Sequence, residues 1–256
     1  ANMTFFSTSG LLEIGGVPFI SHSEKPTRRE ALEYFRRVQE SWKLNIHTYT
    51  EVKQMRRRIG SQDYMVETSR GAYSTRFVVI ATGFYDIPRM MDIPGEDLPK
   101  VKHFYDEAHP YVGQKVLVVG AANSACDVAL ETYHKGAKVS MLIRGSEISS
   151  RVKYWIRPNI INRIKEGSIT AYFNSQLKEI RPHEVVIQTP DEEITIDNDF
   201  VLAMTGYLPN YDLFEKLGLR FSQDEARVPL HDPDTLESEN QPGVYVAGVI
   251  AAGMHT

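Results

Sequence analysis

A run of small residues from Gly120 to Ala125 is the part of this sequence best suited to bind a cofactor. It follows an apolar stretch, residues 115–119, that is predicted to be a strand, and it opens a predicted helix, residues 124–135, that ends at Gly136. Residues 138–143 are predicted to form a second strand. A strand–turn–helix–strand unit of about thirty residues is the setting in which a glycine-containing turn binds a dinucleotide. The candidate cofactor-binding residues of this turn are Gly120, Ala121, Ala122, Asn123, Ser124 and Ala125.

Each position of this turn has its own physical requirement. Gly120 permits a tight turn, and the small side chain of Ala125 lets the helix lie close to the strand. Asn123 or Ser124 is predicted to cap the helix, which leaves backbone N–H groups directed at a pyrophosphate. Ala122 stands where glycine is usual, so the backbone approaches a ligand less freely there. The alternative is a strand–helix turn that binds no phosphate.

The end of the second strand indicates which nicotinamide cofactor would bind. An acidic residue about twenty residues after the glycines would bind the ribose hydroxyl of NADH. Here the strand is followed by Arg144, with Arg151 and Lys153 close behind. Guanidinium and ammonium groups form charge-assisted hydrogen bonds to a 2′-phosphate, so Arg144 and Lys153 favour NADPH. The alternative is that these are solvated surface charges near Glu147.

A strand pattern ending in Thr-Gly and an aromatic residue occurs twice, at residues 76–84 and 199–207. Thr82-Gly83 and Thr205-Gly206 are therefore further candidates for cofactor binding. Gly120 precedes Thr205 by 85 residues (205 minus 120), and the same offset from Thr82 falls before Ala1. We interpret this pattern as two nucleotide-binding copies, of which the first lacks its phosphate-binding start.

The segments between these motifs follow one order in both copies. In the first copy a helix is predicted to begin after Thr27, with Glu30 completing a capping box, and to end near Trp42. Its apolar side is predicted to carry Ala31, Leu32, Tyr34, Phe35 and Val38. Strands are predicted at residues 45–49, 51–58, 63–68, 72–75 and 77–81. In the second copy a helix over 158–167 precedes predicted strands at 169–173, 176–180, 184–189, 193–196 and 200–204.

This tandem order predicts an α/β fold with two Rossmann-like dinucleotide-binding domains, each with an antiparallel β-meander, the first domain being incomplete. The helices argue against an all-β sandwich, which such short strands could otherwise form. Residues 210–217 are predicted to be a short helix, and residues 243–253 a last strand that runs into a glycine-rich turn. This final segment is expected to return and pack on the first copy.

The composition argues against several classes of function. The 256-residue chain is 42% hydrophobic and 24% charged, as is typical of a soluble globular protein. Its net charge of −4 gives no reason to expect a nucleic acid or an anionic membrane as partner. The longest apolar stretch, residues 244–253, is about half the length of a bilayer span, and residues 1–9 do not resemble a signal peptide. We therefore expect a cytoplasmic protein and leave open whether it forms a homo-oligomer.

Other reactive side chains carry weaker signals. Cys126 is the only cysteine, which argues against an internal disulfide, and it fits either a reactive thiolate in a first helical turn or a small packed side chain. The eight histidines lack metal-ligand spacing, so no metal site is expected. His103 and His109 are expected to be interface or surface residues. The pair Tyr154-Trp155 fits either a nicotinamide or substrate contact or ordinary packing.

With these motifs in hand, the chain resembles the flavoproteins with two dinucleotide-binding domains, the thioredoxin-reductase-like group, and within it the bacillithiol-disulfide reductases. The matching stretches span nearly the whole chain. They are residues 2–8 (NMTFFST), 25–28 (KPTR), 81–85 (ATGFY), 93–96 (IPGE), 108–111 (AHPY), 153–155 (KYW), 204–207 (MTGY) and 247–253 (AGVIAAG).

The resemblance implies an enzyme that passes hydride from NADPH to FAD and then electrons to a small-molecule disulfide. It implies an FAD domain formed by residues 1–110 and 206–256 and an NADPH domain formed by residues 111–205. Residues 2–8 would lie beside the flavin, and Val52 would offer its backbone to the adenine. The flavin-side residues implied in this way are Thr4, Phe6, Ser7, Val52, Ala81, Thr82, Gly83, Gly248, Val249, Ile250 and Ala251.

Two departures from the family pattern qualify this expectation. Thioredoxin reductases place an aspartate where Val249 stands, which favours the bacillithiol type. The flavin fingerprint and the neighbouring cysteine would fall before Ala1, and the family's final helix after Thr256, so no catalytic residue is assigned and weak flavin binding is expected. A flavin-dependent monooxygenase and a non-catalytic NADPH-binding fragment remain as alternatives.

Overall fold

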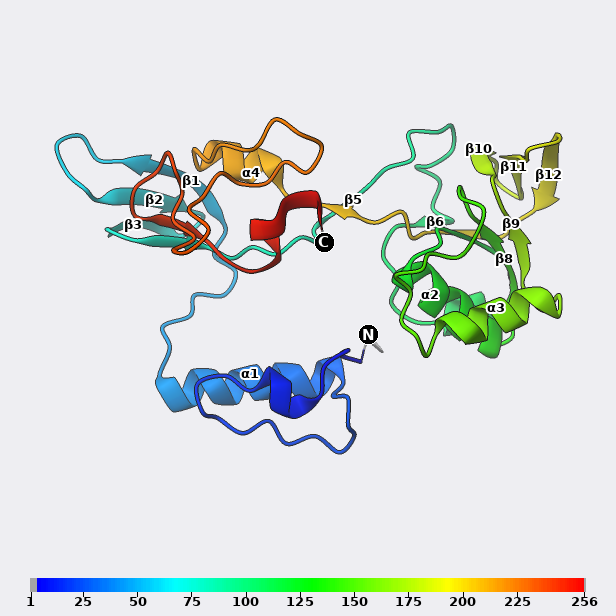
Figure 1. The fold of residues 1–256 in the computed structure, drawn as a ribbon, viewed down its shortest axis with the longest axis horizontal. Coiled ribbons are helices and arrows are strands. Elements are labelled where there is room, and N and C mark those ends of the chain that lie inside the picture. Colours follow the sequence, from blue (N-terminus) through cyan, green and yellow to red (C-terminus); the bar gives the residue numbers. More distant parts are fainter. Residues whose placement is uncertain (1–3, 256) are drawn as a thin grey trace. The chain divides into compact units, whose positions relative to one another are not determined.

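The computed structural model describes residues 4–255, and the chain divides into two compact units (Figure 1). The larger unit comprises Ala1–Ile46 and Met91–Thr205, and the smaller unit comprises His47–Met90 and Gly206–Thr256. Each unit is therefore assembled from two separate stretches of sequence, and each is described here by itself.

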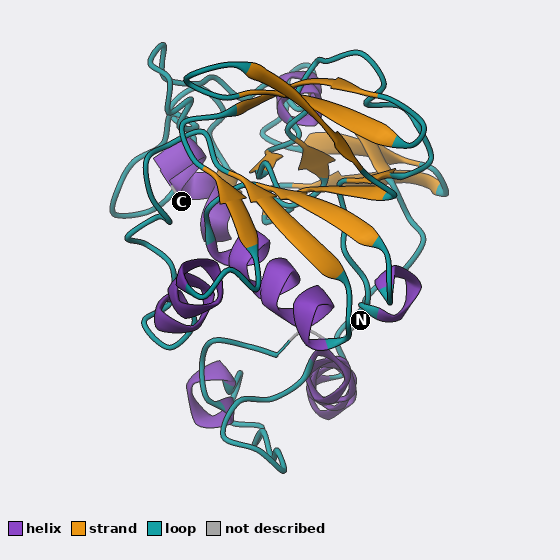
Figure 2. Cartoon of the chain, turned by 90° about the vertical axis from the view of Figure 1, so that its right-hand side faces the viewer, coloured by secondary structure: helices purple, strands orange, loops and turns teal. Residues whose placement is uncertain are grey.

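The larger unit is built on a five-stranded parallel sheet with the strand order β6-β13-β7-β8-β9 (Figure 2). The strands are β6 (Val101–Lys102), β7 (Lys115–Val119), β8 (Lys138–Leu142), β9 (Thr170–Tyr172) and β13 (Phe200–Ala203). Helix α2 (Asn123–His134) connects β7 to β8, and helix α3 (Arg157–Lys165) precedes β9. For all of these except β6, the sequence predicted the element to within two residues, and the α/β fold class is confirmed.

The middle strand of this sheet is apolar along its length because both of its faces are covered. Val116 and Val118 are buried in the cluster that includes residues of α2 and α3. Leu117 is buried on the other face, in the cluster with Val185 of the meander. That meander is an antiparallel sheet in the order β10 (Gln176–Ile180), β11 (Glu184–Gln188) and β12 (Glu193–Asp197), as the sequence predicted.

Helix α1 (Arg28–Trp42) begins with the predicted capping box. The Thr27 hydroxyl accepts a hydrogen bond from the Glu30 N–H at 3.3 Å, and the Glu30 carboxylate accepts one from the Thr27 N–H at 2.8 Å. Ala31, Tyr34 and Val38 are buried, and the Tyr34 ring stacks on Phe19 at 4.3 Å. The predicted apolar side is wrong at two positions, because Leu32 and Phe35 are 42% and 45% exposed and lie outside the stripe that Phe19 covers.

We expect the variant Thr27→Ala to reduce the stability of α1 by about 1 kcal/mol, because an N–H group of the first turn loses its acceptor. Hydrogen bonds from Thr27 and Ser21 lower the pKa of Glu30 from 4.5 to about 2. The contribution of this carboxylate is therefore fully present above pH 4.5 and is lost as the pH falls toward 2. Amide hydrogen exchange in the first turn measures the effect. Thr27→Ser should keep the protection, and equal exchange in both variants would contradict the capping role.

The smaller unit contains a three-stranded antiparallel sheet and two short strand pairs. The antiparallel sheet is β1 (Val52–Arg57), β2 (Tyr64–Thr68) and β3 (Gly71–Thr75); the pairs are β4 (Val78–Ile80) with β15 (Val244–Val246), and β5 (Ile87–Pro88) with β14 (Tyr207–Leu208). Helix α4 (Tyr211–Lys216) supplies Phe214 to a core shared with Tyr64 and Val246. The segment after Gly206 thus packs on residues of the first copy, as predicted.

Three short 3₁₀ segments complete the described chain: Ser9–Leu12, His109–Tyr111 and Gly248–His255. The last of them corrects a prediction, because residues 248–253 were expected to continue the strand into an open turn. Strand β15 is only three residues long since its parallel partner β4 offers no more backbone, and the Ala247 N–H makes a final bond to the Ile80 carbonyl at 2.9 Å.

The strand predicted over residues 45–49 is also wrong. These residues form no strand within the described chain, and Tyr49 turns the backbone with a φ of 52° while 90% of it is exposed. A left-handed residue cannot continue a pleated strand.

Candidate cofactor-binding sites

The turn between β7 and α2 requires glycine at its first position. Gly120 has a φ of 132°, and a Cβ atom there would lie 2.6 Å from the Met204 carbonyl oxygen and 3.1 Å from the Ala125 Cβ. The ends of β7 and β13, together with the first turn of α2, therefore pack so closely that only glycine fits. Both predicted roles, the tight turn at Gly120 and the close helix approach at Ala125, are confirmed.

The capping prediction for α2 is wrong. Ala122 is the N-cap residue, and no side chain caps the helix. The Asn123 amide is engaged elsewhere: its Nδ2 donates to the Arg151 carbonyl at 3.3 Å, and its Oδ1 accepts from the Lys153 N–H at 2.9 Å. The N–H groups of the first turn of α2 thus keep the partial positive charge that favours a phosphate.

The basic residues near this turn have different environments. Arg144 follows β8 directly after Ile143, is exposed, and forms no ion pair within the described part of the chain. Lys153 is half-buried, and its ammonium group lies 3.1 Å from the Asp127 carboxylate. Asn123 holds the backbone of Arg151 and Lys153 against the start of α2. The side chain of Arg151 is exposed and likewise forms no ion pair among the described residues, so Arg144 and Arg151 are both more available to a 2′-phosphate than Lys153.

Trp155 lies among aromatic and cationic neighbours from the start of the chain. The Lys25 ammonium group is 3.5 Å from the centre of the Trp155 ring, and the Phe6 ring is 5.1 Å from it. Tyr154 makes an edge contact with Trp155 and is 81% exposed. Trp155 is therefore occupied in packing, whereas Tyr154 is accessible.

The N-terminal residues implied to lie beside a flavin are held against the segment before α1. Thr4 bridges to Thr27, and the Phe5 N–H donates to the Pro26 carbonyl at 2.9 Å. Ser7 is half-buried and Phe6 is 61% exposed. Asn2 and Met3 lie outside the described residues.

In the smaller unit, the loops after the parallel strands β4 and β15 lie next to each other, because the two strands run side by side in register. Ala81 and Thr82 are exposed, and Gly83 and Gly248 have φ values of 78° and 77°. Adjacent loops at the carboxyl ends of parallel strands are the usual place for a ligand. These loops hold the flavin-side candidates of this unit other than Val52: Ala81, Thr82, Gly83, Gly248, Val249, Ile250 and Ala251.

Individual candidates in this unit differ in what they can offer. The Ile250 side chain is 1% exposed and belongs to the core, so it can contribute only its backbone. Val52 begins β1 and is 39% exposed. Gly206 has a φ of 94°, and its carbonyl accepts a hydrogen bond from the Arg89 N–H at 3.0 Å. Thr205, the last residue of the larger unit, is half-buried.

Cys126 is fully buried in the core that α2 forms with the sheet. Burial and the neighbouring Asp127 raise the pKa of its thiol to about 12. Of the two interpretations open from the sequence, the structure supports the packed side chain, because a buried neutral thiol is a poor nucleophile.

We accordingly expect Cys126 to resist alkylation in the folded protein, about a hundredfold more than in guanidinium at the same pH. Because it is the only cysteine of the chain, the mass gained with iodoacetamide measures its reactivity without ambiguity. Because the pKa of the buried thiol is raised, Cys126 makes its full contribution to the free energy of unfolding below its ordinary pKa of 9.0. That contribution is lost as the pH rises toward about 12. Equal labelling rates in the native and unfolded protein would contradict the burial of this thiol.

One buried acid was not recognised from the sequence. Glu96 is 8% exposed and accepts hydrogen bonds from the N–H groups of Met91 and Asp92, at 2.8 Å and 2.7 Å. The Nε2 atom of His103 lies 3.5 Å from this carboxylate, and the side chain of His103 is 14% exposed. His103 is therefore not an exposed surface residue, whereas His109 is exposed, and the expectation of an interface stays a prediction for both. The motif Pro94-Gly95-Glu96 is the sequence feature that could have indicated this buried acid, because Gly95 packs against the Ile180 backbone.

The described part of the chain offers no candidate group of metal ligands and no candidate membrane-spanning helix. Within the described chain, no group of three histidine, cysteine or acidic side chains could hold a metal ion. None of the helices found between Thr4 and His255 has the length and apolar character that a bilayer span requires.

A glycine-dependent strand–helix turn on a parallel sheet, in a chain with a second pair of parallel strands, places this protein in the dinucleotide-binding α/β class. The family model for pyridine nucleotide-disulphide oxidoreductases matches residues 1–248, and the chain belongs to this family. Membership implies flavin and nicotinamide cofactors.

Individual relatives agree with this assignment. The chain is 42% identical over 253 residues to bacilliredoxin reductase Bdr of Bacillus subtilis, covering 98% of this chain and 77% of that protein. The structure of bacillithiol disulfide reductase Bdr from Bacillus cereus superposes with a TM-score of 0.93 at 39% identity, covering 99% of this chain and 79% of that one. Thioredoxin reductase of Lactococcus lactis matches with a TM-score of 0.71 at 22% identity, over 95% of this chain and 77% of that one, which shows the shared fold.

Proposed function

We propose that this chain is an FAD-dependent reductase that oxidises NADPH and reduces a small-thiol disulfide such as bacillithiol disulfide. The substrate class rests on the Bacillus cereus relative, at 39% identity, whose name is bacillithiol disulfide reductase. The Bacillus subtilis relative, at 42% identity, is named bacilliredoxin reductase. When bound, the nicotinamide supplies a hydride and the flavin passes the electrons on, so the part of the protein is to bind and orient both rings.

The observation that carries the NADPH proposal is the turn at Gly120. A Cβ atom at this position would collide with the Met204 carbonyl, and the uncapped N-terminus of α2 presents free N–H groups next to it. This combination fits a pyrophosphate. Arg144, exposed at the end of β8, is the proposed partner of the 2′-phosphate, and Lys153 is the second.

For FAD we propose, in the smaller unit, the loops that follow β4 and β15 together with Val52. In the larger unit, Thr4, Phe6 and Ser7 stay the flavin-side candidates that the resemblance implies. The open backbone at Gly83 and Gly248, where nothing lies within 4 Å of a Cβ position, supports a close approach of the cofactor. The corresponding domains are residues 111–205 for NADPH and residues 1–110 with 206–256 for FAD. Oligomeric state and cytoplasmic location stay predictions.

No residue of this chain is assigned to the reduction of the disulfide itself. Cys126 is unsuited to it, because a buried thiol with a pKa of about 12 cannot attack a disulfide near neutral pH. The proposed role of the described residues is to bind NADPH and FAD.

Anaerobic NADPH consumption tests the proposal, with purified protein, added FAD and bacillithiol disulfide. We expect NADPH oxidation that depends on both FAD and the disulfide, with glutathione disulfide as the comparison substrate. The same assay is repeated in air, where NADPH oxidation that needs oxygen and yields an oxygenated substrate would instead favour a flavin-dependent monooxygenase. Nucleotide binding without any electron transfer would favour the non-catalytic alternative.

A further inference from the structure

A cavity of about 380 Å³ lies in the larger unit at the end of the parallel sheet away from Gly120. Its walls include the first residues of three strands, Lys115 of β7, Lys138 of β8 and Thr170 of β9. The Gly120 turn follows the opposite end of β7, and five residues of strand separate the two places by about 16 Å. The cavity is therefore distinct from the dinucleotide turn.

Four hydroxyl side chains line this cavity: Ser168 donates to the Glu166 carboxylate, and the other three are Ser140, Thr170 and Tyr172. Ser140 is paired with Thr170, and Leu142 with Tyr172, in the ladder between β8 and β9, so the three hydroxyl side chains share one face of the sheet. Within the described chain, none of these three hydroxyls makes a hydrogen bond to another group of the protein. They are free to bind a polar ligand.

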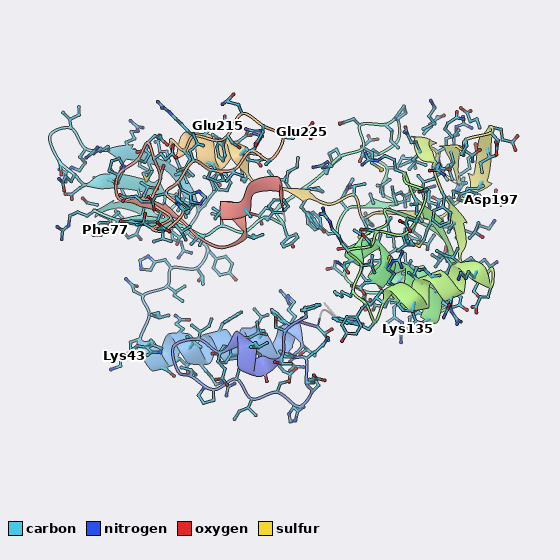
Figure 3. All side chains as sticks on the ribbon, in the orientation of Figure 1. Lys43, Phe77, Lys135, Asp197, Glu215 and Glu225 are labelled. Carbon is cyan, nitrogen blue, oxygen red and sulfur yellow. The ribbon has the colours of Figure 1, made fainter. Side chains whose placement is uncertain are left out.

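The charged groups of the cavity favour an anion. Lys138 is exposed and has no ion-pair partner among residues 4–255. The Lys115 ammonium group is 2.5 Å from the Asp197 carboxylate, at the end of β12 labelled in Figure 3. Lys115 is thus paired with Asp197, and Lys138 is the cation left for a ligand.

Asn198 also lines the cavity and is 2% exposed. Its Nδ2 donates to the Phe200 carbonyl at 2.7 Å and to the Lys115 carbonyl at 3.3 Å, which fixes the orientation of the amide. Its Oδ1 is buried and has no surface open to the cavity, so Asn198 shapes the wall and offers no group to a ligand.

We propose that this cavity binds a small hydroxylated anion, a carboxylate or phosphate on a short carbon frame. Lys138 binds the anionic group, and the hydroxyls of Ser140, Thr170 and Tyr172 bind the oxygens of the ligand. Leu117 and Ile196 supply apolar wall for the carbon frame. The volume lies in the range of small-molecule sites, about 300–1,000 Å³.

Amide-resolved NMR of the full 256-residue chain tests the proposal, with malate and inorganic phosphate as separate probes. Signals of residues 115–117, 138–140 and 170–172 report the cavity, and those of residues 120–124 report the dinucleotide turn. The variants are Lys138→Gln and Ser140→Ala. The control is Lys135→Gln, an exposed lysine at the end of α2 that does not line the cavity (Figure 3).

We expect saturable shifts of the cavity signals, with half-saturation at about tenfold higher probe concentration in Lys138→Gln and no change in Lys135→Gln. Saturation with malate alone identifies a carboxylate ligand, and saturation with phosphate alone identifies a phosphate ligand. Saturation with both probes identifies a site that accepts either anionic group. The proposal is overturned if neither probe shifts these signals, if only residues 120–124 respond, or if Lys138→Gln binds like the unaltered chain. Because the two groups of signals are read separately, the result does not depend on whether NADPH binds at Gly120.

Discussion

Replacing Gly120 with alanine is expected to abolish measurable NADPH binding and to lower the free energy of unfolding by about 3 kcal/mol. The new Cβ atom would lie 2.6 Å from the Met204 carbonyl oxygen, and the φ of 132° is strained for any residue with a side chain. The chain can relieve the collision only by moving the end of β7 away from β13, and this moves the start of α2 as well. Nucleotide titration followed by protein fluorescence, together with urea unfolding, measures both effects.

Gly10→Ala is the matched control for this prediction. Gly10 does not have a positive φ, and nothing lies within 4 Å of its Cβ position. We expect this variant to bind NADPH and to unfold like the unaltered chain. If Gly120→Ala remained fully folded and bound NADPH with unchanged affinity, the Gly120 turn would not be the nucleotide site.

The elements of the larger unit could be predicted closely because their signals are local. The strand 115–119, the helix after it and the strand from Lys138 are contiguous, and each is marked by an apolar run, a glycine or a change of hydrophobic period. The strand predicted over 45–49 failed for the opposite reason. A few alternating residues do not reveal whether a neighbouring strand exists, and within the described chain none pairs with them.

The same division applies to the candidate site. The roles of Gly120 and Ala125 follow from the turn itself, so the local sequence was sufficient to predict them. The amide of Asn123 was predicted to cap its own helix, but its partners are 28 and 30 residues further along the chain. The buried pair of Glu96 and His103 likewise depends on folding of the segment around Gly95. Long-range hydrogen bonds of this kind are not encoded in local spacing.

Cys126 shows how burial can decide between two interpretations that the sequence leaves open. A cysteine in the first turn of a helix fits a reactive thiolate, and one that faces a sheet fits a packed side chain. The helix places Cys126 on the side toward the sheet, with no exposed surface, and the pKa of its thiol rises accordingly. The same helix can therefore present its N-terminus to a dinucleotide while its only thiol stays unreactive.

The choice between NADPH and NADH is expected to depend mainly on Arg144. Arg144→Ala should weaken NADPH binding by about tenfold to a hundredfold and leave NADH binding nearly unchanged, because one charge-assisted interaction with the 2′-phosphate is lost. Arg144→Glu should invert the preference, since a carboxylate repels the phosphate and can accept a hydrogen bond from the ribose hydroxyl of NADH. Lys153→Ala should have a smaller effect, because the Lys153 ammonium group is already paired with Asp127 at 3.1 Å.

Titrations of both nucleotides at two salt concentrations distinguish a specific contact from a general attraction between charges. Lys178→Ala is the control, because it removes one exposed positive charge from β10, away from the Gly120 turn. A general effect would lower the affinity for NADPH equally in Arg144→Ala and Lys178→Ala, and more strongly at low salt. A specific effect changes the ratio of the NADPH affinity to the NADH affinity only when Arg144 is altered. If Arg144→Ala left that ratio unchanged, the 2′-phosphate would have to bind elsewhere, and Arg144 would be an ordinary solvated charge.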